Sequence, residues 1–106
     1  MEELNVNLHW IGEDLLISVE GGEKPHIGCT VLAVPRPSLR GDGTLSCTSS
    51  VINVTGHKDE MICRKIAEKA VRKYGCTVVC AGGFHKDRIS EEEIESLMEK
   101  VDQLEL

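Results

Sequence analysis

The sequence predicts an α+β domain in which a mostly antiparallel β-sheet is covered by two helices, in the order ββββαβα. Three observations support this fold class. Four segments in the first half are rich in β-branched residues or alternate between apolar and polar residues, as strands do. Two later segments carry apolar residues at helical spacing. The 106 residues suffice for one hydrophobic core, so we expect residues 1–106 to form a single domain.

The first two strands are predicted from alternation and a turn. Residues 4–11 alternate, with apolar side chains at the even positions from Leu4 to Trp10, which is typical of a half-buried strand. The turn at 12–14 leads into the apolar segment 15–20. Because the connection is short, we expect these two strands to form an antiparallel hairpin.

Two further strands are predicted on either side of an exposed loop. After a break at 21–25, residues 27–34 are apolar on both faces, as in a central strand that is covered on each side. Pro35 is expected to end this strand, because proline cannot donate to a ladder. The Gly- and Ser-rich segment 38–46 predicts an exposed loop, and residues 47–54 predict the fourth strand.

The second half predicts a helix, a strand and a helix. Residues 57–74 carry one apolar and one basic face, and Gly75 is a favourable cap for the C-terminus of this helix. Residues 76–81 predict a short fifth strand, and 82–88 a loop. Ser90 with a glutamate three residues later predicts a capping box that opens an acidic last helix, which we expect to face the basic one.

Composition excludes several classes of function. The net charge of −6 gives no attraction for nucleic acid or an anionic membrane, and only three residues are aromatic. Five cysteines without a CxxC pair argue against a complete disulfide framework and a four-ligand zinc site, so we expect reduced thiols. The acidic N-terminus does not resemble a signal peptide, and no run reaches transmembrane length. We therefore expect a cytoplasmic protein.

Polar residues that could bind a ligand gather in four places. Glycines and cations accompany one another in two of these segments, 21–28 and 82–87, where a ligand can approach the backbone closely. The serines before the helix start at 57 lead to free N–H groups, which favour an anion such as phosphate. An arginine between two prolines is a stiffly held cation. The candidates are Lys24, His26, Arg36, Ser49, Ser50, His57, Lys58, Gly82, Gly83, Phe84, His85 and Asp87.

These residues form no known catalytic motif. His26, His57 and His85 could converge as metal ligands or proton-transfer groups, but their spacing is not that of HExxH or any other diagnostic metal motif. Phosphate loops of the GxxxxGK[ST] or GxGxxG type are absent from the sequence. Composition and spacing alone predict a small binding domain, without a bound metal.

Three segments taken together resemble the prenylated-flavin chaperones, small microbial proteins associated with UbiD-type and gallate decarboxylases. They are GGEKPHIGC…VLAVPRPSL (residues 21–39), TSSVINVTGHKDE (48–60) and GGFHKDRISEEEIE (82–95). The resemblance implies a fold like that of the dimeric proteasome-assembly chaperones. It also implies a homodimer that binds reduced prenylated FMN and delivers it to a UbiD-type decarboxylase, without itself being an enzyme.

On this resemblance the twelve candidates are assigned to the ligand pocket. Arg36, Lys58 and the helix start near His57 are expected to hold the phosphate, with His26 and His85 nearer the rings. Phe84 is the aromatic residue placed to pack on the isoalloxazine. An alternative function is an assembly chaperone or scaffold that acts through protein contacts, without a small ligand.

Overall fold

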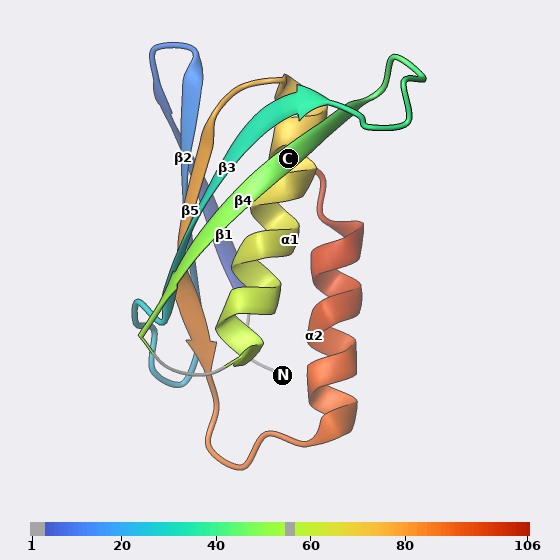
Figure 1. Ribbon diagram of the computed structural model, residues 1–106. Helices are drawn as coiled ribbons and strands as arrows, with labels where there is room; N and C mark the ends of the chain where they lie inside the picture. Colours follow the sequence, from blue (N-terminus) through green and yellow to red (C-terminus); the bar gives the residue numbers. More distant parts are fainter. Residues whose placement is uncertain (1–3, 55–56) are drawn as a thin grey trace.

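The predicted order of strands and helices is confirmed. The computed structural model describes residues 4–54 and 57–106, while the side chains of His57 and Lys58 lie outside this description. The described residues form β1 (Leu4–Ile11), β2 (Asp14–Gly22), β3 (Cys29–Pro37), β4 (Leu45–Asn53), α1 (His57–Tyr74), β5 (Val78–His85) and α2 (Glu91–Gln103), all shown in Figure 1.

The five strands form one sheet in the order β1-β2-β5-β3-β4. The predicted hairpin of β1 and β2 is confirmed, and β3 pairs antiparallel with both β4 and β5. β5 lies parallel to β2. Three of these four pairings are antiparallel, so the predicted α+β class with a mostly antiparallel sheet is confirmed.

Both helices lie on the same face of the sheet (Figure 1), with α1 against β3, β5 and β4, and α2 against α1. The layer between α1 and the sheet is the core. Its largest fully buried side chains include Ile17, Val31, Ile62, Ile66, Phe84 and Leu97. The other face, which we call the open face, carries no helix. The expectation that both faces of the central strand are covered is therefore wrong for a single chain, since Leu32 and Val34 of β3 are 41% and 42% exposed.

Three strands extend beyond their predicted ends. β3 continues through Pro35 to Pro37, because its pairing with β5 stops at Ala33 and only β4 lies beside it beyond that point. β2 runs to Gly22 instead of ending at 20, and β5 runs to His85, so residues 82–85 of the predicted loop 82–88 belong to a strand. These ends pair with one another, Gly22 lying opposite His85.

The helix ends follow the predicted local chemistry. Ser90 and Glu93 form the reciprocal capping box of α2, and Gly75 ends α1 with a φ of 64°. The basic and acidic helices meet where the Lys65 ammonium lies 3.0 Å from the Asp102 carboxylate. Within the described residues, neither helix combines the length and the hydropathy that crossing a lipid bilayer requires.

Candidate functional site

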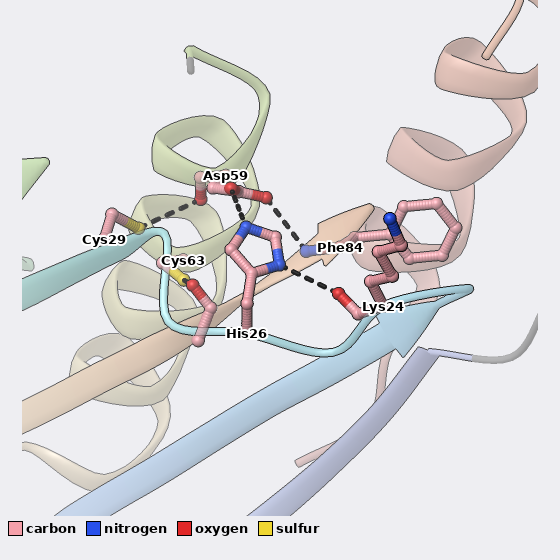
Figure 2. A network of polar contacts seen from close by, with 7 residues as sticks. Lys24, His26, Cys29, Asp59, Cys63 and Phe84 are labelled. Carbon is pink, nitrogen blue, oxygen red and sulfur yellow. Dashed lines mark hydrogen bonds and ion pairs between the residues drawn. The ribbon is translucent and has the colours of Figure 1, made fainter. Parts of the chain in front are cut away.

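A buried carboxylate, Asp59, joins four parts of the chain at the end of the sheet. It lies in the first turn of α1 and is 4% exposed. Its Oδ1 accepts a hydrogen bond from the backbone N–H of Phe84 at 2.9 Å, and its Oδ2 lies 3.1 Å from Nε2 of His26. Its backbone carbonyl accepts the Cys29 thiol at 3.2 Å. Figure 2 shows how this group, which we call the Asp59 network, ties β3, α1 and β5 to the loop 23–28.

At the end of the sheet, the Asp59 carboxylate accepts a backbone hydrogen bond that a neighbouring strand would otherwise accept. The pairing of β3 with β5 ends where Cys29 lies opposite Gly82, so the N–H of Phe84 lies beyond the last paired residue of β3. A buried N–H without an acceptor costs free energy, and Asp59 supplies the acceptor. Its negative charge is also favourable at the positive end of the helix dipole.

Two glycines make room for the network. A Cβ on Gly28 would lie 2.0 Å from Oδ2 of Asp59, which no side chain could tolerate. A Cβ on Gly83 would lie 3.0 Å from the His26 ring and 3.1 Å from Cγ of Asp59. The sequence predicted that glycines in these two segments let a ligand approach the backbone closely. In the structure, the side chains of Asp59 and His26 approach the backbone at Gly28 and Gly83 instead.

His26 bridges its own loop and the helix. Its Nδ1 lies 3.0 Å from the carbonyl oxygen of Lys24, and its Nε2 faces the Asp59 carboxylate, so both ring nitrogens face acceptors. Only the protonated imidazole carries a hydrogen on both nitrogens and donates to both oxygens. The side chain remains 35% exposed and can still contact a ligand.

The thiols beside the network are held protonated. Burial raises the pKa of the Cys29 thiol far above its usual range, and Cys63 and Asp59 act in the same direction. A hydrogen bond with Cys80, followed by burial, does the same to the pKa of Cys63. All five cysteines are free, as predicted. These buried thiols act as packing groups and weak donors and are not nucleophiles.

His85 and Asp87 form a second, exposed pair beside the network. Nε2 of His85 lies 2.8 Å from Oδ1 of Asp87, and the rings of His26 and His85 meet edge to face with centroids 6.1 Å apart. The hydrogen bond with His85 lowers the pKa of the Asp87 carboxyl, and the charge of Lys24 lowers it further. The structure thus brings together Lys24, His26, Gly82, Gly83, His85 and Asp87 from the predicted set.

Three other candidates lie apart from this group. Arg36 donates from Nε to Oγ1 of Thr48, near the opposite end of β3. Seven residues separate Arg36 from Cys29, which at about 3.3 Å per residue is about 23 Å. Ser49 faces α1, where it donates to Glu68, while its neighbour Ser50 is exposed on the open face. Within one chain, a phosphate at the start of α1 therefore cannot also contact Arg36.

The remaining candidates are Phe84, His57 and Lys58. Phe84 is fully buried in the core, which corrects the expectation that its ring lies ready to pack on an isoalloxazine. The side chains of His57 and Lys58 lie outside the described residues, so their expected contacts are not described. Among the described residues, no three potential ligands are grouped in a way that could hold a metal ion.

Sequence reasoning missed the centre of the site, Asp59. An acidic residue in the first turn of a helix is ordinary, since it favours the helix dipole, and nothing in the local pattern marks it as buried. The available signal was indirect. Gly28, at the end of the loop 23–28, and Gly83, in β5, both leave room for one side chain that must come from elsewhere in the chain.

Comparison with known proteins places the chain in a family. No curated protein matches the chain at a significant level. A solved structure described as a novel chaperone complex for yeast 20S proteasome assembly matches at a TM-score of 0.44 and 10% identity, covering 96% of this chain and 91% of that one. That likeness is too weak to bear on function. The family model for the prenylated flavin chaperone LpdD-like domain matches residues 1–105, and the chain therefore belongs to this family.

Proposed function

We propose that the protein is a non-catalytic carrier in the cytoplasm that binds reduced prenylated FMN and delivers it to a UbiD-type decarboxylase. The observation that carries this proposal is the family match over residues 1–105. Carrying and handing over a cargo requires binding that differs between carrier and acceptor, and it needs no group that stabilises a transition state.

The residues near the Asp59 network are compatible with such a cargo. The Lys24 ammonium supplies positive charge at the loop 23–28, where it acts on Asp87, and the partly exposed His26 ring lies beside the first turn of α1. The aromatic pair of Trp10 and Tyr74 lies at the far end of α1, about 22 Å from Asp59 at 1.5 Å per residue. A flavin bound near His26 would therefore rest mainly on aliphatic side chains, backbone and imidazole.

We further propose a homodimer formed over part of the open face. Large apolar side chains on this face are exposed in the single chain, with Leu16 at 37%, Leu32 at 41% and Ile52 at 74%. Their β-strand register places them in adjacent rows across the sheet. Exposed apolar surface of this kind marks protein contacts. Analytical ultracentrifugation should give a dimer mass, and a species of 11.7 kDa at all concentrations would contradict it.

Binding is tested by titrating the purified protein with reduced prenylated FMN under anoxic conditions and following absorbance. We expect saturable binding at micromolar concentrations. Absence of binding in that range would overturn the proposal. Oxidised FMN serves as the comparison ligand, because a carrier for the reduced, prenylated form should discriminate against it.

Delivery requires a second experiment. The loaded protein is mixed with a UbiD-type decarboxylase that lacks its cofactor, and decarboxylation is compared with that obtained from the same concentration of free cofactor. A faster or more complete activation by the loaded carrier is expected. If instead the protein copurifies with proteasome subunits and activates no decarboxylase, the alternative function as an assembly chaperone is the correct one.

A further inference from the structure

A shallow pocket of about 320 Å³ opens on the uncovered face of the sheet, beside the Asp59 network. Two of its lining residues, His26 and Gly82, belong to the predicted set, and the others were not anticipated from the sequence. The lining comprises Ser18, Val19 and Glu20 of β2, Pro25, His26 and Ile27 of the loop 23–28, and Ala81 and Gly82 of β5.

We infer that this pocket holds the isoalloxazine ring system of the flavin, an assignment that rests on the proposed function. The floor is built from small side chains, because the strand register places Ser18 beside Ala81. The same row continues on β3 with Thr30, which lies outside the pocket lining. Two strand spacings of about 4.8 Å make this row about 10 Å long from β2 to β3. A row of this length suits a flat system of three fused rings.

The row is flanked by the sheet on one side and by the loop 23–28 on the other. One side is the next row of the open face, in which Leu16, Val79 and Leu32 lie beside one another and are apolar. The other side is the loop 23–28, from which the largely exposed Ile27 and Pro25 line the pocket. The lining itself is apolar on the loop side, at Pro25 and Ile27, whereas the row with Leu16, Val79 and Leu32 lies next to the pocket on the open face.

Apart from His26 on the loop, the polar side chains that line the pocket, Ser18 and Glu20, lie on β2 and distinguish the two ends of a flavin. Glu20 only accepts hydrogen bonds when ionised, and Ser18 can donate or accept. The pyrimidine edge of a reduced flavin carries N–H donors, whereas its dimethylbenzene edge is apolar. The pyrimidine edge therefore belongs at Ser18 and Glu20. The phosphate is repelled by Glu20 and belongs toward Lys24, which precedes the lining residue Pro25 on the loop and whose charge acts on Asp87.

The size of the pocket limits how much cargo one chain encloses. Ligand pockets generally range from about 300 to 1,000 Å³, and this one lies at the lower end. One chain therefore holds the ring system and leaves the ribityl phosphate and part of the prenyl-derived ring accessible. The Asp59 network acts as a support, since it fixes the loop that forms one wall through His26.

The experiment compares two identical substitutions on the same face of the sheet. Ser18→Leu fills the floor of the pocket, whereas Ser46→Leu adds the same side chain on the open face of β4, opposite Arg36 and outside the pocket. Affinity for reduced prenylated FMN is measured by anoxic absorbance titration. We expect Ser18→Leu to weaken binding at least tenfold and Ser46→Leu to leave it within twofold of the wild type.

The possible outcomes separate the pocket from the proposed function. If the wild type does not bind the reduced flavin, the proposed function fails and this assignment fails with it. If the wild type binds and Ser18→Leu binds equally well, only the pocket assignment is overturned. It is also overturned if both variants lose binding together with the dimer, because the open face is then occupied by a second copy alone.

A polar substitution covers the case in which Ser18→Leu does not fold, as judged by circular dichroism. Glu20→Gln keeps the shape of the side chain and removes the negative charge at the pocket, with Glu13→Gln in the exposed β1–β2 turn as its control. We expect Glu20→Gln to change affinity at least threefold and to alter the absorbance of the bound flavin. An affinity and spectrum equal to those of the Glu13→Gln control would overturn the assignment.

Discussion

Replacing Asp59 by alanine removes the acceptor at the centre of the network, and its cost follows from the contacts. The backbone N–H of Phe84, buried and bonded at 2.9 Å, loses its acceptor, which costs about 1 to 3 kcal/mol. The contact with His26 adds only about 0 to 1 kcal/mol, because that ring is 35% exposed and solvent screens the pair. We therefore expect the free energy of unfolding to fall by about 1 to 4 kcal/mol.

The assay is equilibrium urea denaturation, with the slope m unchanged if only the native state is affected. Asp59→Asn should cost less than the alanine variant, since the amide oxygen can still accept from one of the two partners. Asp102→Ala is the matched control, because its carboxylate is 59% exposed and forms only the surface pair with Lys65. This control should stay within about 0.5 kcal/mol of the wild type.

Hydrogen exchange at a single amide separates this explanation from general destabilisation. In the wild type the Phe84 amide should exchange only on global opening, whereas in Asp59→Ala it should exchange faster than its neighbours in β5. If Asp59→Ala is as stable as Asp102→Ala and the Phe84 amide stays protected, the carboxylate does not complete the sheet and our reasoning is wrong.

Three further predictions concern neighbouring contacts. Lys69→Met removes an ammonium that donates hydrogen bonds to three backbone carbonyl groups at the end of α2. The amides in the last turn of α2 should therefore exchange faster, and the free energy of unfolding should fall by about 1 kcal/mol. His85→Gln should raise the pKa of Asp87 toward its usual value, measured by carbon NMR. Because that pKa is lowered in the folded wild type, the stabilisation is present above the usual carboxyl pKa and disappears as pH falls through the lowered value. Gly83→Ala should destabilise by about 1 to 3 kcal/mol by pressing on Asp59, and unchanged urea midpoints would contradict it.

Local pattern sufficed for the kind and order of the elements, because alternation and helical spacing are properties of short segments. The β1–β2 hairpin, the cap at Ser90 and the end of α1 at Gly75 were all predictable for this reason. The position of β5 between β2 and β3 was not, since parallel pairing connects segments far apart in the chain.

The glycine pair in β5 shows why strand ends were misjudged. Gly82 and Gly83 predict a loop, because glycine weakens strands. In the fold they are needed within the strand, where a Cβ on Gly82 would lie 1.7 Å from the carbonyl oxygen of Val19. The same limit applies to the site. The sequence identified His26, Lys24 and His85 as polar residues near glycines. Nothing local indicated that Arg36 lies toward the other end of β3, about 23 Å along the strand from Cys29.

Handover sets a limit on how well the pocket should bind. A carrier that gives up its cargo must bind it more weakly than the acceptor does, and each tenfold difference in dissociation constant corresponds to about 1.4 kcal/mol. In the proposed function, a site of about 320 Å³ that leaves the phosphate accessible would let the acceptor contact one end of the cargo before the ring leaves the other. Transfer can then proceed without release into solution. In the proposed function, a pocket that stays open toward the acceptor is therefore a property that a carrier requires.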